Sequence, residues 1–224
     1  MKLSIIVPIL DEAAGLPNFL AALAPLLDQD VELIVVDGGS TDASLDLANA
    51  SPAKVLQCLP GRARQMNVGA AIASGDVLLF LHADTQLPND AVQRIESALT
   101  TSVRVWGRFD VTINSTRWTL SVVARLLSWR SRLSGIATGD QAMFVTRAAF
   151  VESGGFPDLP IMEDIELSKR LKLLSAPICL HARVLTSGRR WETRGTWRTI
   201  LLMWRLRWAY WRGADVHLLA RDYR

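Results

Sequence analysis

The sequence predicts an α/β protein with an open, doubly wound and mostly parallel sheet flanked by helices. β-branched apolar runs alternate along the chain with segments whose apolar residues recur at helical spacing. The run at 77–81 is apolar throughout, which is typical of a strand buried on both faces of a parallel sheet. A chain of 224 residues suits one domain of this kind.

Strand and helix segments follow each other regularly through the first 81 residues. Pro8 is predicted to end the first strand, and the glycine-containing turn at 37–39 ends the second. Each strand is followed by a polar turn and then by a helical pattern. The predicted elements are strand 3–7, helix 13–27, strand 31–36, helix 42–50, strand 54–57, helix 62–73 and strand 77–81.

The later part of the chain is predicted to hold a strand over 142–145, a helix over 165–174 and a basic amphipathic helix over 196–212. Residues 183–224 contain ten arginines and few acids, so this end should face an anionic partner. On a helical wheel the last helix divides into a tryptophan face and an apolar face. The first holds Trp197, Trp204, Trp208 and Trp211, and the second Leu202, Met203, Leu206 and Tyr210.

The composition excludes several classes of protein. Half of the residues are hydrophobic and 21% are charged, which excludes a disordered or fibrous chain. Cys58 and Cys179 lie far apart without metal-type spacing, so neither a zinc site nor a disulfide framework is expected. The short apolar start runs directly into Asp11 and Glu12, unlike a signal peptide, and no run is long enough to span a membrane. We therefore expect a cytoplasmic protein, peripheral if it meets the inner face of the membrane.

Acidic residues follow three of the predicted strands. Asp11 and Glu12 follow the first strand, Asp37 ends the second, and Asp84 follows the apolar run. Ligands bind beyond the carboxyl ends of such strands, so these acids are predicted to meet in one crevice. Each alone would suit an ordinary turn, but three strand ends together favour a site. No GxGxxG follows the first strand, which disfavours a nicotinamide cofactor.

Four motifs resemble, in order, those of the family 2 glycosyltransferases: SIIVPILDEA, VVDGGSTD, GDVLLFLHADT and the MED at 162–164. More narrowly, GDQAMFV, GGFPDLPIMED and TSGRRWE resemble a small bacterial subgroup associated with radical-SAM and selenium-type gene clusters. The resemblance implies a single GT-A domain over 1–224. Within it, 1–100 would be the nucleotide-sugar-binding half, 101–192 the acceptor half and 193–224 a basic Trp-rich C-terminal helix.

The resemblance implies a binding site for the sugar donor, a UDP- or GDP-sugar. Asp37 matches the acid that reads the base, and Asp11 stands where the family usually has Asn. Arginine binds phosphate oxygens through planar bidentate pairs, although a solvated helix face explains either Arg62 or Arg64 taken singly about as well. The implied donor-binding residues are Pro8, Asp11, Glu12, Asp37, Gly38, Arg62, Arg64, Asn67, Asp84 and Arg190.

The resemblance also implies a divalent cation, Mn²⁺ or Mg²⁺. Asp84 matches the last position of the family's DxD motif, but His82 stands at the first. One carboxylate with phosphate oxygens and waters can still hold such an ion. An imidazole ligand would favour Mn²⁺, yet a histidine at a strand end is more often simply hydrogen-bonded. His82, and His181 at the end of a later predicted strand, are therefore weaker metal candidates than Asp84.

Catalysis is assigned to Asp164 as the base, with Glu163 as its support, on the family pattern. Acids are also common in the first turn of a helix, which is the structural alternative. Asp140 and Gln141 resemble the acceptor-side segment, with a turn-capping role for Asp140 equally favoured. Arg190 and Trp191 resemble part of the QxxRW motif of processive members, but Ser187 replaces its Gln, so processive synthesis is not expected.

The tryptophan face of the last helix is typical of an interfacial anchor on an anionic membrane. Residues 117–133 repeat the pattern with Trp118 and Trp129. A homodimer interface is the alternative, since such interfaces are also rich in Trp and Arg. We favour the membrane, because a lipid-linked acceptor would explain both helices. Nucleic acid is not an expected partner, because no recognition motif accompanies the arginines.

The sequence thus predicts an enzyme that moves a sugar from a nucleotide-diphosphate sugar to a hydroxyl of a lipid or small-molecule acceptor. The resemblance implies inversion at the anomeric carbon. A nucleotidyltransferase of similar fold is one alternative, although no basic residue stands in the loop after the first strand. A non-catalytic nucleotide-sugar-binding protein is the other.

Overall fold

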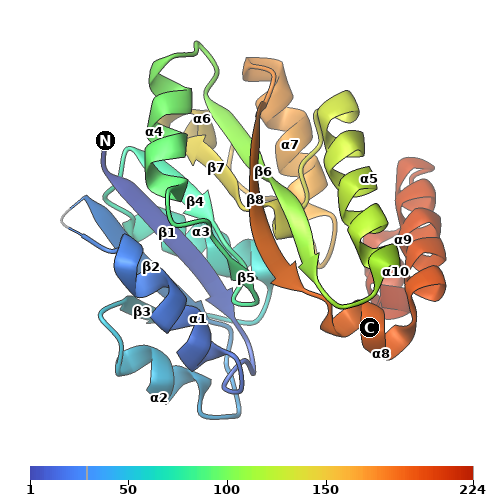
Figure 1. The fold of residues 1–224 in the computed structure, drawn as a ribbon, viewed down its shortest axis with the longest axis horizontal. Coiled ribbons are helices and arrows are strands. Elements are labelled where there is room, and N and C mark those ends of the chain that lie inside the picture. Colours follow the sequence, from blue (N-terminus) through green and yellow to red (C-terminus); the bar gives the residue numbers. More distant parts are fainter. Residues whose placement is uncertain (29, 224) are drawn as a thin grey trace.

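A computed structural model describes residues 1–28 and 30–223, and the side chains of residues 190 and 194 lie outside the description. Over the described residues the strands form one eight-stranded sheet in the order β3-β2-β1-β4-β7-β6-β8-β5 (Figure 1). They are β1 (Leu3–Ile9), β2 (Val31–Asp37), β3 (Lys54–Gln57), β4 (Val77–Phe80), β5 (Thr85–Gln86), β6 (Trp106–Asn114), β7 (Met143–Thr146) and β8 (Ile178–Ser187).

Ten α-helices and two 3₁₀ turns accompany the sheet over the same described residues. The helices are α1 (Leu16–Leu23), α2 (Ser44–Asn49), α3 (Arg62–Ile72), α4 (Ala91–Thr100), α5 (Trp118–Ser134), α6 (Arg147–Glu152), α7 (Glu163–Leu174), α8 (Arg189–Arg194), α9 (Thr196–Trp211) and α10 (Val216–Tyr223). The 3₁₀ turns are η1 (Ala24–Leu26) and η2 (Gly139–Gln141).

The sheet is parallel in its first half and mixed in its second. β1 pairs in parallel with β2 and β4, and β2 with β3. β7 runs antiparallel between β4 and β6, while β6 and β8 are parallel. The two-residue β5 pairs antiparallel with β8, so a strand that follows β4 completes the far edge. The predicted α/β class, with a mostly parallel open sheet, is confirmed.

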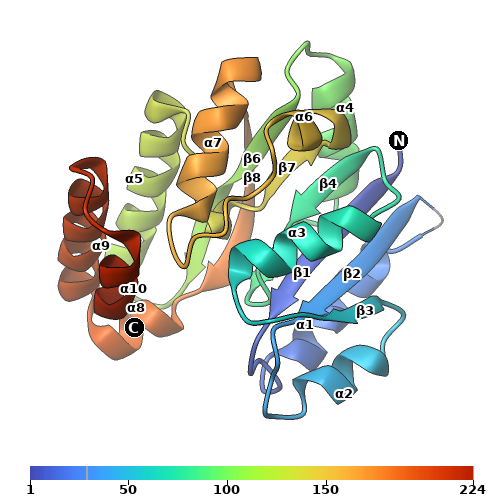
Figure 2. The same cartoon turned by 180° about the vertical axis from the view of Figure 1, so that it is seen from behind.

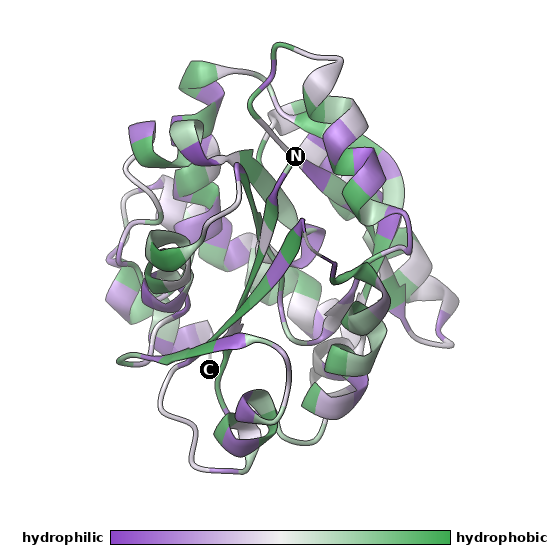
Figure 3. Ribbon diagram, turned by 90° about the vertical axis from the view of Figure 1, so that its left-hand side faces the viewer, coloured by the Kyte–Doolittle hydropathy of each residue, from purple (hydrophilic) through white to green (hydrophobic). Residues whose placement is uncertain are grey.

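Helices cover both faces of the sheet, because adjacent residues of each central strand point to opposite sides. Ile5 and Val7 of β1 lie in a core with residues of α1, α2, α4 and α5. Ile6, between them, lies in a second core with residues of α3, α6 and α7. Figure 2 shows α3, α6 and α7 in front of the sheet, and the mainly hydrophobic strands run between the helices in Figure 3.

The prediction that Pro8 ends the first strand is wrong, since β1 continues to Ile9 with Pro8 opposite Val36. Ile6 O accepts a hydrogen bond from Leu81, so alternate residues of β1 that include Pro8 face β4. The β1–β4 pairing ends at Ile6 and Phe80. The missing N–H of Pro8 therefore removes no ladder hydrogen bond.

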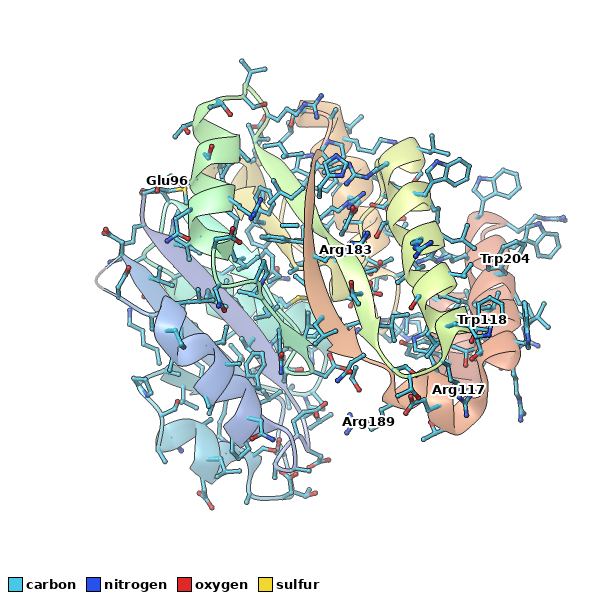
Figure 4. The ribbon with its side chains drawn as sticks, viewed as in Figure 1. Glu96, Arg117, Trp118, Arg183, Arg189 and Trp204 are labelled. Carbon is cyan, nitrogen blue, oxygen red and sulfur yellow. The ribbon has the colours of Figure 1, made fainter. Side chains whose placement is uncertain are left out.

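The C-terminal region is three helices rather than one. α9 and α10 form a small core of their own, with Leu206 and Leu219 packed on Ile161. The predicted division of α9 is confirmed: Leu206 is fully buried, whereas its four tryptophans are 59–79% exposed. Figure 4 shows Trp118 of α5 and Trp204 of α9 at the same outer edge of the view. None of the helices over the described residues is long and apolar enough to cross a bilayer.

Candidate active site

The carboxyl ends of β1 and β2 are joined by the two acids that follow them. Asp37 is fully buried, and its carboxylate accepts hydrogen bonds from the backbone N–H of Gly39 and Ser40. Asp11 has a φ of 52°, a left-handed conformation that Asp and Asn tolerate well, and its Oδ1 accepts a 2.7 Å bond from Thr41 N. The two acids together fix the turn at 38–41.

Gln65 is a component of this edge that the sequence did not single out. Its buried Nε2 donates to Ile9 O and to Val36 O, both at 2.8 Å, and so ties the ends of β1 and β2 to α3. A Cβ on Gly38 would lie 3.0 Å from the Gln65 amide, which explains glycine there. The signal in the sequence was weak, because one glutamine in a helix is unremarkable by itself.

The polar residues of α3 reach the loop that leads to α7. Arg62 Nη1 lies 3.7 Å from Glu163, and Arg64 pairs with Asp158 at 2.7 Å. Asn67 both donates to and accepts from the backbone of Phe156. The Asn67 amide, which was expected to contact the diphosphate, is therefore already engaged in hydrogen bonds that hold this loop.

Asp84 lies exposed just beyond β4, at the same edge as Glu12. Burial raises the pKa of Glu12, Arg189 at 3.6 Å counteracts this, and the charge of Asp84 raises it further. Figure 4 shows Arg189 below the end of β8, where α8 begins. Among the described residues no three His, Cys, Asp or Glu side chains gather as a metal site. An ion on Asp84 would need substrate oxygens and water for its remaining ligands.

The two histidines proposed as weaker metal ligands do not gather with Asp84. His82 turns inward, where its ring lies so close to Gly139 that a Cβ there would be 2.4 Å from Nε2. Burial and the charge of Arg62 lower its pKa well below the usual range, so the ring is neutral. The expectation that His181 ends a strand is wrong. It lies within β8, beside the register shift of that strand, with Nδ1 3.2 Å from Arg132.

Asp164 lies in the first turn of α7, next to η2 and His82. Its Oδ2 accepts a 2.8 Å hydrogen bond from Gly139 N, and Oδ1 accepts one from its neighbour Ile165. Burial and the adjacent charge of Glu163 raise the pKa of Asp164 to about 7, although both backbone bonds oppose the shift. Met162, directly before the pair, has a left-handed φ of 67°. Asp164 and His82 line one small cavity with Met66 and Phe156.

None of the described residues expected to bind the acceptor lines this cavity, although Asp140 and Gln141 directly follow Gly139, which does. The Gln141 side chain accepts a hydrogen bond from Thr138 N and closes η2, while its Nε2 is buried without a partner among the described residues. Asp140 Oδ1 is buried and unpaired in the same sense. Trp191 packs against the main core instead of standing free to stack on a sugar. The side chain of Arg190 lies outside the described part.

The sequence comparison gives this arrangement a family. Residues 4–153, more than half of the chain, match glycosyl transferase family 2. The match covers β1 to β7 and includes every strand-end acid described above. The chain therefore belongs to glycosyl transferase family 2.

Curated relatives carry matching names. A PGL/p-HBAD biosynthesis glycosyltransferase of Mycobacterium bovis is 43% identical over 91 residues, which are 38% of this chain and 36% of that protein. An undecaprenyl-phosphate 4-deoxy-4-formamido-L-arabinose transferase of Serratia proteamaculans is 28% identical over 62% of this chain and 46% of its own length. The chain thus spans less than half of the length of either relative.

Solved structures agree on the fold. Staphylococcus aureus TarS in complex with UDP gives a TM-score of 0.68 at 19% identity, over 84% of this chain and 60% of that one. Glucosyl-3-phosphoglycerate synthase from Mycobacterium tuberculosis, with Mn²⁺ and UDP-glucose, gives 0.59 at 24% identity, over 81% and 69%. The fold is that of the GT-A glycosyltransferases.

Proposed function

We propose that the protein transfers a sugar from a UDP- or GDP-sugar to an acceptor hydroxyl, with inversion. The observation that carries this proposal is Asp164, a carboxylate whose pKa is raised to about 7 and which lies beside the crevice edge. A general base works best when its pKa lies near the working pH. Family membership and the structures of relatives with UDP-sugars support the same reaction.

In this proposal the first half of the chain binds the nucleotide. The turn fixed by Asp11 and Asp37 would face the nucleoside, and Arg62 and Arg64 would face the diphosphate. A divalent cation held by Asp84 would supply positive charge for the departing diphosphate. The exposed carboxylate fits an ion that takes its other ligands from substrate and water, as the Mn²⁺ of the related synthase suggests.

The acceptor hydroxyl would lie against Asp164. Because Gly139 N donates to Oδ2, the carboxylate keeps one orientation while it takes the hydroxyl proton. The half-exposed Arg62, 3.7 Å from Glu163, would balance the charge of this second acid. The O–H bond breaks as the oxygen attacks the sugar carbon, and the bond from that carbon to the diphosphate oxygen breaks on the opposite face.

The test is release of UDP or GDP from nucleotide sugars in the presence of Mn²⁺. Wild-type protein should release nucleotide, and Asp84→Ala should lose roughly 10²-fold in rate. Asp90→Ala, at an exposed acid near the start of α4, is the matched control. Equal turnover by wild type and Asp84→Ala would sink the proposal. A nucleotidyltransferase would instead release pyrophosphate, and a non-catalytic binding protein would release neither.

We further propose that the exposed tryptophans of α5 and α9 dock on an anionic membrane, where a lipid-linked acceptor would be presented. Arg198 and Arg205 flank the tryptophans, and the acceptor of the related undecaprenyl-phosphate transferase is lipid-linked by its name. Wild-type protein should co-sediment with vesicles that contain about 30% phosphatidylglycerol, whereas the double variant Trp204→Ser/Trp208→Ser should not. A concentration-dependent dimer lost in the same variant would favour the homodimer instead.

Three finer assignments belong to this proposal. The motifs GDQAMFV and TSGRRWE support membership of the subgroup associated with radical-SAM gene clusters. Division into a donor half over 1–100 and an acceptor half over 101–192 agrees with where the acids and η2 lie. We also propose a peripheral position on the cytoplasmic face of the membrane, which the exposed tryptophans of α5 and α9 support only as far as membrane contact goes.

A further inference from the structure

Arg130 of α5 is a partly buried cation that no part of the proposed reaction uses. Its Nε and Nη2 are inaccessible to solvent and have no hydrogen-bond partner among the described residues. An unpaired guanidinium out of water is costly, so such a group usually has a partner. Burial lowers the pKa of Arg130, while the carboxylates of Asp140 and Asp164 oppose this. The guanidinium therefore lies within electrostatic range of the base.

The two unpaired atoms are the pair that matters for recognition of an oxyanion. Nε–H and one N–H of Nη2 point the same way and form the planar fork that binds two oxygens of a carboxylate or phosphate. No acid of the described residues fills this fork, although Asp140 is close enough to act on its charge. The fork is thus directed at something other than a side chain that the structure describes.

Neighbouring arginines show what structural pairing looks like in this region. Arg108 bonds Asp110 and the carbonyl of Ser128, and Arg132 bonds Asp110 at 2.7 Å and the carbonyl of Cys179. Asp110 is therefore shared between two cations and leaves nothing for Arg130. Arg130 is instead acted on by the charges of Asp140 in η2 and of Asp164.

The surrounding unpaired atoms add a second requirement. Asp140 Oδ1 needs a donor, and Gln141 Nε2 needs an acceptor. A hydroxyl meets both needs, because it donates one hydrogen bond and accepts others. Because Asp140 acts on the charge of Arg130 and Gln141 is its neighbour in η2, an anion on Arg130 with a hydroxyl beside it would meet the needs of all three side chains.

We propose that Arg130 binds a phosphate or carboxylate group of the acceptor side-on, so that a hydroxyl near this anion meets Asp140 and Asp164. The acceptor class is then a hydroxylated anion. This inference rests on the proposed sugar transfer and adds the charge of its acceptor. Arg130 would determine acceptor specificity, leaving donor binding to the strand-end acids.

The test is binding of small anions while UDP and Mg²⁺ saturate the donor side. Glycerol phosphate, glycerate and glycerol are titrated by calorimetry into wild type and Arg130→Gln. Both anions should bind wild type, glycerol should not, and Arg130→Gln should bind the anions at least about tenfold more weakly. Arg125→Gln, at an exposed arginine of the same helix, should bind like wild type.

Two outcomes would overturn the assignment: no anion binding by wild type, or equal binding by Arg130→Gln. Arg130→Lys keeps the charge without the fork and should recover only part of the affinity. UDP binding, measured in the same samples, reports on folding and on the donor side. If wild type does not bind UDP, the proposed function is refuted. If wild type binds UDP but not the anions, only the assignment of Arg130 is refuted.

Discussion

The two sides of the crevice differ in how their polar groups are paired. On the side proposed to bind the nucleotide, Asp11, Asp37 and Gln65 bond backbone groups of the adjoining turns and strands. On the side proposed to bind the acceptor, buried atoms of Arg130 and Asp140 have no partner among the described residues. At the ends of the parallel strands, nearby side chains supply the missing hydrogen bonds, whereas in our proposal the bound acceptor supplies them on the other side. The nucleotide side would then be preorganised, and the acceptor side would determine which acceptor binds.

The largest effect on the difference between the two sides is expected at Asp164, the proposed base. Asp164→Asn should lower the rate of sugar transfer roughly 10²–10⁴-fold, because an amide cannot take the hydroxyl proton. The affinity for UDP should stay within about twofold of wild type, since donor contacts lie on the other side. Nucleotide release and calorimetry measure the two quantities. Glu152→Gln, the same change at an exposed acid of α6, is the control.

The rate should also depend on pH through the same residue. Asp164 must be ionised to act as a base, and its folded pKa is about 7. The transfer rate should therefore rise about tenfold per pH unit below pH 7 and level off above it. A pH–rate profile at saturating donor measures this. A rate that is flat from pH 5 to about 8 would contradict the assignment.

Stability should change in the opposite direction. The folded pKa of Asp164 is raised above its usual 3.8, so folding favours the protonated acid, and stability is lost as pH rises from about 4 through 7. Asp164→Asn cannot ionise and should melt several degrees above wild type at about pH 8, but not at about pH 4. Thermal melts at both values measure the difference, and a variant less stable at pH 8 would count against the burial argument.

A smaller effect is expected at the junction between the two sides. Gly139→Ala places a Cβ 2.4 Å from His82 Nε2, so the Gly139 N–H that orients Asp164 must shift. Transfer should fall about tenfold while UDP affinity is kept. Gly15→Ala is the matched control, because nothing lies within 4 Å of its Cβ. Equal kinetics for both variants would argue against an orienting role of η2.

The smallest effect is expected on the preorganised side. Gln65→Ala leaves Ile9 O and Val36 O without their buried donor, which should cost about 1–3 kcal/mol of stability. UDP should bind only a few-fold more weakly, since Asp11 and Asp37 still hold the turn. Urea unfolding measures the first quantity, with the exposed Gln57→Ala as control. A large loss of UDP affinity would place Gln65 in direct contact with the nucleotide.

Sequence patterns predicted the four strands up to residue 81 and β7, because apolar alternation records burial directly, but they gave no bounds for β5, β6 or β8. They gave seven elements up to residue 81 with ends shifted by a few residues, and they gave both faces of α9. They could not place Pro8, because its tolerance depends on where the β1–β4 pairing stops. They gave α9 to within a residue of its end but did not give α8 or α10, which the division implied by the resemblance counted as part of one C-terminal helix.

The sequence predicted the candidate site residues at strand ends but not those within helices. Asp37 and Asp84 stand at strand ends, where the order of the chain fixes the edge of the sheet. Arg130 and Gln65 lie within helices, and their roles come from which way a side chain turns in three dimensions. The spacing of the arginines along α5 does not show which of them pairs with Asp110 and which has no partner among the described residues. Spacing alone therefore could not separate Arg130 from Arg132.

The packing of α9 and α10 sets how far the chain can be shortened. Tyr210 donates to Glu166 of α7, and Leu206 and Leu219 pack on Ile161. Met162, which packs on the same cluster, is the residue held at positive φ just before the acidic pair. A truncated form ending near residue 195, made to remove the exposed tryptophans, would also remove the helices that pack on Ile161 and Met162, just before the proposed catalytic acids. Solubility is better sought by replacing the outer tryptophans singly.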